Sequence, residues 1–177
     1  MFANQELYIS DANFAIDPEE ISPNFEPHQI QGIRVQKQIF DALANWGGYN
    51  GEWTKEQGSF VYVKGKHSPH DWEFHRNNGV IDYFDAKTHG VNSKYYSCSL
   101  NQKISWYRYV RDGHNFFIFG GINVSERIVR IEGLWGYGSL NIEESVFKEK
   151  GHQDKPTYRF KAPHVSRNLL RQHSQIR

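Results

Sequence analysis

The sequence predicts an α/β fold of the α+β kind, in which a mixed central sheet is flanked by helices. An amphipathic segment at residues 28–46 precedes three short segments that alternate between apolar and polar residues, as strands do. A second amphipathic segment at 100–111 is followed by a continuous apolar run at 115–122, which fits a strand buried on both faces after a crossover helix. The predicted order is therefore helix, three strands, helix, strand, within a single domain over residues 1–177.

The composition bounds the class of protein. The chain has 177 residues, of which 38% are hydrophobic and 15% aromatic, so it is long enough for a core and is not disordered. The formal net charge of +1 means that nucleic-acid binding would require a local basic patch. The single Cys98 excludes an internal disulfide and suggests a reducing compartment. There is neither a long apolar run nor a signal-peptide pattern, so we expect a soluble, cytoplasmic protein with no membrane partner.

The first helix is predicted over residues 28–46, after an irregular arm at 1–27 that contains three prolines. Gly47 and Gly48 end the helix. Gln36 is a polar residue within its apolar stripe. The predicted stripe consists of Ile30, Ile33, Ile39, Phe40, Leu43 and Trp46.

The three strands follow this helix. Residues 59–64 alternate and form the first strand. Residues 71–88 are predicted to form a β-hairpin, with a turn at 77–79. The turn reads Asn-Asn-Gly, and these residues tolerate the positive φ that tight hairpin turns require.

The register of this hairpin decides where two acids lie. If the loop has three residues, Arg76 pairs with Val80 and Asp71 lies directly opposite Asp85. Opposed residues have Cβ atoms about 4.5–5.5 Å apart, so the two carboxylates repel unless a cation lies between them. A two-residue turn at 78–79 would shift the pairing by one and move Asp71 to the other face of the sheet. The sequence leaves both registers open.

The second helix is predicted over residues 100–111, with Ser99 as its N-cap, after a loop at 89–92. We expect Leu100, Ile104, Tyr107 and Val110 or Arg111 to form its buried face, flanked by Gln102, Trp106 and Tyr109.

The remainder of the chain extends this arrangement. Residues 127–135 alternate again and could add a strand to the sheet. Residues 136–156 are expected to form a loop, 157–161 a short strand and 164–173 a terminal basic helix.

Four residues of the hairpin resemble the active-site signature of the PD-(D/E)XK nuclease superfamily. Asp71 matches its first acid, and Asp85, Ala86 and Lys87 match its (D/E)-x-K. The sequence departs from the pattern because His70 separates Asp71 from the preceding proline.

The element order strengthens the resemblance. Helix, three strands, helix, strand is the αβββαβ core of that superfamily, which has the restriction-endonuclease-like fold. The resemblance covers roughly residues 28–124, with 1–27 as an N-terminal arm and 125–177 as a C-terminal extension.

The resemblance implies a Mg²⁺-dependent endonuclease that hydrolyses phosphodiester bonds in DNA, with Mn²⁺ as a substitute metal. Asp71 and Asp85 would bind the metal with the carbonyl oxygen of Ala86, and Lys87 would position or activate the attacking water. Two carboxylates suffice because Mg²⁺ keeps several waters. Nucleases of this kind often dimerise to cut both strands, so the expected partners are DNA and a second copy of the chain.

Several further residues are secondary candidates. Glu73 lies in the hairpin near the acids. The first helix of the superfamily often supplies a Glu to the metal, and here Gln36 is the best-placed substitute. Gln102 begins a Gln-x-x-x-Trp stretch, where some members carry Gln-x-x-x-Tyr near the nucleic acid. Candidate nucleic-acid contacts are the basic residues Lys103, Arg167 and Arg171.

Two alternatives remain open. The first is a non-catalytic module of the same fold that binds nucleic acid or protein, with Trp106, Tyr107 and Trp135 as stacking or docking surfaces. The second is a ribonuclease of the same fold.

Overall fold

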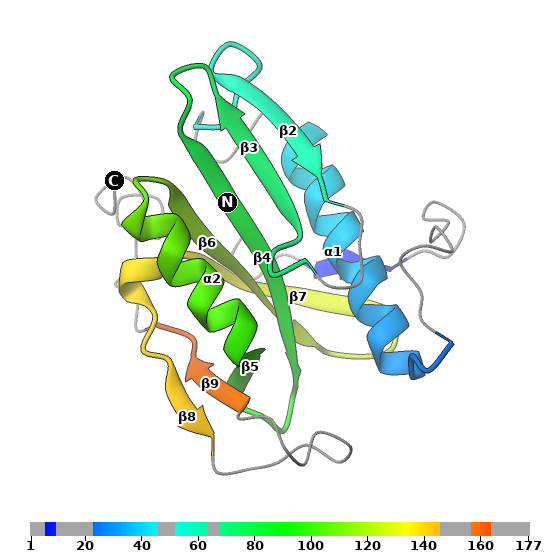
Figure 1. The fold of residues 1–177 in the computed structure, drawn as a ribbon. Coiled ribbons are helices and arrows are strands. Elements are labelled where there is room, and N and C mark those ends of the chain that lie inside the picture. Colours follow the sequence, from blue (N-terminus) through cyan, green and yellow to red (C-terminus); the bar gives the residue numbers. More distant parts are fainter. Residues whose placement is uncertain (1–5, 10–22, 46–51, 64–67, 146–156, 164–177) are drawn as a thin grey trace.

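The computed structural model describes residues 6–9, 23–45, 52–63, 68–145 and 157–163. Two long helices, α1 (Pro27–Asn45) and α2 (Leu100–Arg111), pack with two β-sheets in this part of the chain (Figure 1). The predicted terminal helix at 164–173 lies outside the described residues. None of the described helices has the length and apolarity needed to span a membrane.

The larger sheet confirms the predicted fold class. Its strand order is β1-β7-β6-β4-β3-β2, and only the β4–β6 pair is parallel. Apart from β5, which belongs to the smaller sheet, the chain order α1, β2, β3, β4, α2, β6 is the predicted helix, three strands, helix, strand. The strands are β1 (Glu6–Tyr8), β2 (Gly58–Tyr62), β3 (Trp72–Arg76), β4 (Ile81–Gly90), β6 (Asn115–Asn123) and β7 (Ile128–Gly136).

A smaller sheet was predicted only in part. It has the order β5-β9-β8, with β5 (Tyr95–Ser99), β8 (Glu143–Ser145) and β9 (Thr157–Lys161). The sequence predicted β9, but not β5 or β8. A short 3-10 helix, η3 (Tyr137–Ser139), leads into it.

Two loop predictions were also wrong. Residues 6–8 form an edge strand on β7, where we predicted an irregular arm. Strand β4 continues through His89 and Gly90, where we predicted a loop, because it stays paired with β6 to Asn123.

The hairpin has the three-residue loop. Glu73 pairs with Tyr83, and the backbone N–H of Arg76 donates to the carbonyl oxygen of Val80 at 2.9 Å. Gly79 has φ 87°, which is the left-handed conformation that this turn requires. Of the two registers that the sequence left open, this one directs the side chains of Asp71 and Asp85 to the same face.

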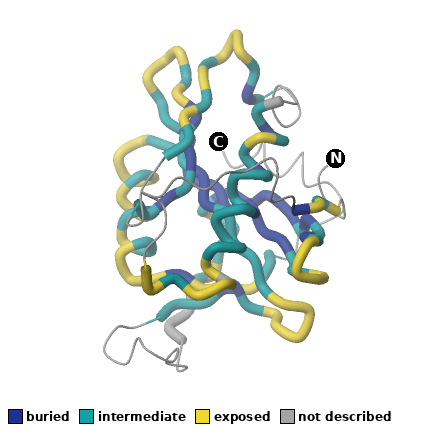
Figure 2. Tube along the Cα trace, turned by 90° about the vertical axis from the view of Figure 1, so that its right-hand side faces the viewer, coloured by how far each residue is buried: buried dark blue, intermediate teal, exposed yellow. Residues whose placement is uncertain are grey.

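The larger sheet separates two apolar cores. On one face, Val35, Ile39 and Leu43 of α1 are buried against the sheet. On the other face, Trp106 of α2 is buried against β6. Strand β6 is buried on both sides, as its continuous apolar run predicted. Figure 2 shows that the buried part of the trace lies at the centre of the molecule. The burial of Val35 corrects the predicted stripe of α1, since Val35 was not part of that stripe, whereas Ile33, which was part of it, lines a cleft.

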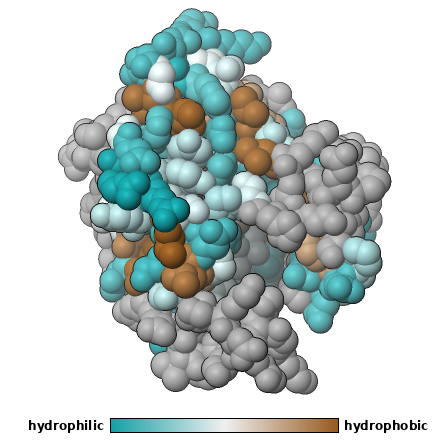
Figure 3. Space-filling model, viewed as in Figure 1, coloured by the Kyte–Doolittle hydropathy of each residue, from teal (hydrophilic) through white to brown (hydrophobic). Residues whose placement is uncertain are grey.

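The buried face of α2 also differs from the prediction. Leu100, Ile104, Tyr107 and Val110 are exposed, and Tyr107 is 55% exposed. Figure 3 shows an apolar patch over the start of this helix. The single large ring of Trp106, stacked on Phe116 with centroids 4.5 Å apart, fills the space that the predicted aliphatic stripe would have filled. The buried face of α2 is therefore the side of Trp106, which we predicted to flank the buried face.

Candidate active site

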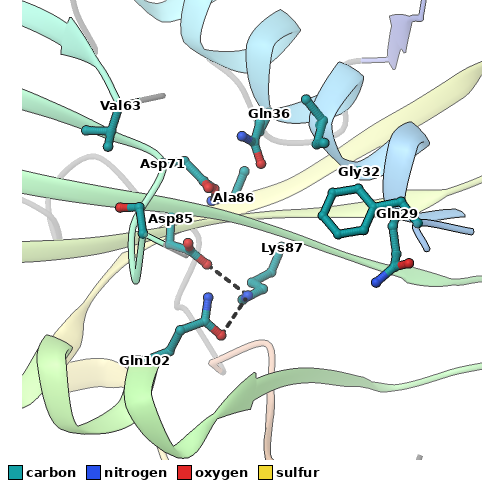
Figure 4. Close-up of a pocket in the computed structure, with 12 residues that line it drawn as sticks. Gln29, Gly32, Gln36, Val63, Asp71, Asp85, Ala86, Lys87 and Gln102 are labelled. Carbon is teal, nitrogen blue, oxygen red and sulfur yellow. Dashed lines mark hydrogen bonds and ion pairs between the residues drawn. The ribbon is translucent and has the colours of Figure 1, made fainter. Parts of the chain in front are cut away.

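A cleft of about 350 Å³ lies beside the start of β3, with residues of α1 and α2 in its lining (Figure 4). The hairpin lines it with the four residues of the predicted signature, namely Asp71, Asp85, Ala86 and Lys87. Gln36 of α1 and Gln102 of α2 also line it. The structure thus brings together six of the predicted site residues.

Asp71 is fixed at both its backbone and its side chain. Its backbone N–H donates to the carbonyl oxygen of Phe84 at 2.8 Å, and its Oδ2 accepts from the backbone N–H of Ala86 at 2.7 Å. The N–H and C=O of one strand residue point to the same edge, so the carbonyl oxygen of Ala86 also faces this end of β3. Two kinds of oxygen ligand therefore converge here, a carboxylate and a backbone carbonyl.

Asp85 is 1% exposed, and its Oδ2 lies 3.1 Å from Nζ of Lys87. That oxygen is buried and has no hydrogen-bond partner of good geometry among the described residues. Burial raises the pKa of Asp85, although the ammonium of Lys87 opposes the shift. Burial and then the charge of Asp85 raise the pKa of Asp71 well above its ordinary value. The protein alone therefore leaves the two carboxylates with uncompensated negative charge.

Lys87 completes the site as a cation. Burial alone would lower its pKa, but the charges of Asp85 and Asp71 outweigh burial, and the pKa of Lys87 is raised. Lys87 is therefore an ammonium at neutral pH. Its Nζ donates to Oε1 of Gln102 at 3.3 Å (Figure 4). The same oxygen accepts from the backbone N–H of Ser99 at 3.1 Å. Gln102 thus belongs to the capping box of α2 and also holds the lysine.

Helix α2 also holds the segment that precedes Asp71. The indole N–H of Trp106 donates to the carbonyl oxygen of Pro69 at 2.7 Å. The ring of His70 bonds the hydroxyl of Tyr109 through Nδ1 at 2.8 Å. His70, which separates Asp71 from Pro69, is therefore a buried anchor between this segment and α2, a role that the sequence did not reveal.

Glu73 lies outside the lining of the cleft. Its Oε1 bonds Nε2 of His70 at 2.7 Å, and its Oε2 bonds His75. Burial opposes the shift, but the hydrogen bonds from His75 and His70 lower the pKa of Glu73. This carboxylate is engaged by two imidazoles and is not directed at the acid pair.

The other predicted residues are placed as follows. Nε2 of Gln36 donates to the hydroxyl of Tyr62 at 2.9 Å at the side of the cleft. Nζ of Lys103 lies 4.2 Å from the ring centroid of Tyr158, outside the lining of the cleft. Arg167 and Arg171 lie outside the described residues.

Asp82 is a buried acid that the sequence analysis did not single out. Its carboxylate accepts from Nε1 of Trp53 at 2.7 Å, from Nε of Arg76 at 2.9 Å and from Nδ2 of Asn115 at 2.8 Å. A carboxylate with this many donors is satisfied by the protein itself. Asp82 therefore holds together the hairpin, β6 and the loop before β2. Asp85, in contrast, has a buried oxygen that accepts no hydrogen bond.

The residues of the cleft fit a divalent cation with oxygen ligands. Among the described residues, no group of three or more His, Cys, Asp or Glu is placed to hold a metal. Mg²⁺ does not need such a group, because it is commonly held by one or two carboxylates with waters completing the shell. Oδ2 of Asp85 forms an ion pair with Lys87 but accepts no hydrogen bond, and such an ion would bind this oxygen and balance the remaining charge of the acid pair.

The chain matches no family model and no curated protein. Among solved structures, it is similar to Hjc, a Holliday junction resolvase from the archaeal hyperthermophile Archaeoglobus fulgidus. The sequence identity is 12% and the TM-score is 0.39, over 72% of this chain and 87% of that chain. A TM-score of this size carries no argument about activity, so the function proposed below rests on the geometry of the site.

Proposed function

We propose that this protein is a Mg²⁺-dependent nuclease that hydrolyses phosphodiester bonds in DNA. The observation that supports this most strongly is the pair formed by half-buried Asp71 and buried Asp85 beside the ammonium of Lys87 in an open cleft. Two neighbouring carboxylates repel each other, so a cation bound between them is stabilised. The same cation would also neutralise the negative charge of a nucleic-acid phosphate.

Asp71 and Asp85 would hold the metal, with the carbonyl oxygen of Ala86 as a further ligand. When bound, Mg²⁺ would neutralise the charge of the phosphate and lower the pKa of a water in its coordination sphere. Mn²⁺ provides the same oxygen-ligand chemistry and would substitute.

Lys87 would donate to the oxygens of the phosphate that become more negative during the reaction. It suits this role and not that of a base, because its raised pKa keeps it protonated at neutral pH. Gln102 positions it through the hydrogen bond to Nζ. Gln36 lines the opposite side of the cleft and would contact the bound substrate or its water.

The structure leaves little exposed aromatic surface for the alternative, a non-catalytic module that stacks on bases. Trp106 is fully buried and Trp135 is 3% exposed, so neither ring is available to stack on a base. Of the three predicted aromatics, only Tyr107 is exposed.

Plasmid nicking with Mg²⁺ tests the proposal. Asp85→Asn and Lys87→Ala should each lower the rate by about 10²–10³-fold, because each removes a charge that acts in the transition state. Asp112→Asn and Lys55→Ala are matched controls, since both lie on the exposed surface and outside the cleft, and both should cleave like the wild type. Undiminished cleavage by both folded site variants would refute the assignment. Parallel assays on RNA test the ribonuclease alternative.

A further inference from the structure

A second cleft, of about 370 Å³, lies at the far end of β4 and is lined in part by β7 and β9. Its charged lining residues are His89, Lys94, Arg130, Glu132 and Lys161. None of them belongs to the predicted site.

A β-bulge places the acid of this cleft. Gly120 of β6 pairs with Gly133 of β7, and Gly121 pairs with Ile131, so Glu132 is an extra residue without a partner in the ladder. Its Oε1 accepts from the hydroxyl of Tyr96 and lies 3.3 Å from Nε2 of His89. This carboxylate oxygen therefore already has two partners within the protein, and Glu132 fixes the position of the His89 ring.

Three cations remain on the wall of the cleft. Lys94 and Lys161 are exposed, and Arg130 is half-buried. None of the three forms an ion pair with an acid among the described residues. Lys161 only lies over the ring of Tyr95, with Nζ 5.2 Å from the centroid. The cleft thus carries an excess of positive charge in a chain whose formal net charge is +1.

The two clefts follow one strand. Lys87 lines the first and His89 lines the second. Residues two apart on a strand point to the same face and are separated by about 6.6 Å along it. An extended anion with evenly spaced charges could therefore contact both clefts along β4.

We propose that this second cleft binds a backbone phosphate of the same DNA strand whose scissile phosphate lies at Asp71, Asp85 and Lys87. The inference rests on the proposed function and adds a binding site to it. Lys94, Arg130 and Lys161 would supply the donors, since ammonium and guanidinium groups make most phosphate contacts in such complexes. His89, held by Glu132, faces the same space.

The test is the salt dependence of binding, which is measured without cleavage. A short fluorescein-labelled duplex with 5′-hydroxyl ends is titrated with the full chain in EDTA at several NaCl concentrations. Ends without phosphate ensure that the protein can bind only backbone phosphates. Each phosphate that the protein neutralises adds about 0.9 to the magnitude of the slope of log K against log salt, so removal of one cation that binds a phosphate should reduce the slope by that amount.

The double variant K94Q/K161Q should lower the slope by at least about 0.9 while its melting temperature is unchanged, because both side chains are exposed. Lys55→Gln is the matched control and should keep the wild-type slope. A slope in the double variant equal to that of the control overturns the inference, and so does a wild type that does not bind the duplex.

Plasmid nicking by Asp85→Asn separates this inference from the proposed function. Loss of nicking in that variant together with an unchanged slope in the double variant overturns the second cleft alone. Wild-type nicking by Asp85→Asn overturns the catalytic assignment, while the salt slope still reports on the second cleft.

Discussion

The backbone N–H of Ala86 donates a hydrogen bond to Oδ2 of Asp71 at 2.7 Å. The first acid is thereby attached to the strand that carries the second, and the two carboxylates cannot move apart to relieve their repulsion. Burial raises the pKa of both acids, and the charge of Asp85 raises the pKa of Asp71 further.

Asp71→Asn should stabilise the metal-free protein. The amide keeps an oxygen for the N–H of Ala86, and it replaces a like charge beside Asp85 with a donor. Stabilising single substitutions commonly add about 0.5–2 kcal/mol, so we expect a gain of about 1 kcal/mol. For a chain of this size the melting temperature would rise by about 2–4 °C, measured by calorimetry in EDTA. An unchanged or lower melting temperature would contradict the proposed repulsion.

Asp82→Asn should have the opposite effect. It removes the charge that compensates the side chain of Arg76, which is largely buried, and breaking such a pair costs about 3–5 kcal/mol. Urea denaturation measures the loss. Asp112→Asn is the control, because its ion pair with Arg111 is exposed and should contribute little. Similar losses in both variants would contradict the structural role of Asp82.

Mg²⁺ should raise the melting temperature of the wild type. A ligand that binds only the folded state stabilises it by about 2.7 kcal/mol at a concentration 100 times its Kd. Asp85→Asn should abolish the shift, since it removes one of two carboxylate ligands. Ca²⁺ and Mn²⁺ titrations show whether oxygen-ligand cations in general have this effect. A shift of equal size in the variant would place the ion elsewhere.

The pair of His89 and Glu132 should give a defined pH dependence of stability. The hydrogen bond between them raises the pKa of His89 above 6.5, and the same hydrogen bond lowers the pKa of Glu132 below 4.5. The contribution of Glu132 is present above pH 4.5 and is lost as the pH falls through its folded value. The contribution of His89 is present below pH 6.5 and is lost as the pH rises through its folded value.

The stabilisation from this pair is therefore complete between pH 4.5 and 6.5. The difference in unfolding free energy between the wild type and Glu132→Gln, followed across the pH range, should be largest there and should decrease on the alkaline side. The difference in unfolding free energy between His89→Gln and the variant that carries both His89→Gln and Glu132→Gln should lack the alkaline decrease. An alkaline decrease that persists without His89 would assign it to another group.

The sequence predicted the part of the site that lies on one hairpin. Turn chemistry and alternation located β3 and β4, but they left two registers open. The choice between them depends on contacts far away in sequence, because Trp106 and Tyr109 of α2 bind Pro69 and His70 just before Asp71. No local pattern encodes such contacts.

The orientation of α2 shows a similar limit. Its sequence carries aliphatic residues on one face and Trp106 on another, and either stripe has helical spacing. Packing against Phe116 decides in favour of the indole, and the partner for that choice lies on a strand that follows the helix. The small sheet was missed for the same reason, since β5 is short and its pairing with β9 joins residues more than fifty positions apart.

One amide oxygen, Oε1 of Gln102, both closes the first turn of α2 and accepts from the ammonium of Lys87. Fraying of that turn, a local opening that amide hydrogen exchange detects below global melting, would leave Asp85 as the lysine's remaining partner at the site while the sheet stays intact. Heating would then disorder the proposed site before it denatures the chain, so the proposed activity would have an inactivation temperature of its own.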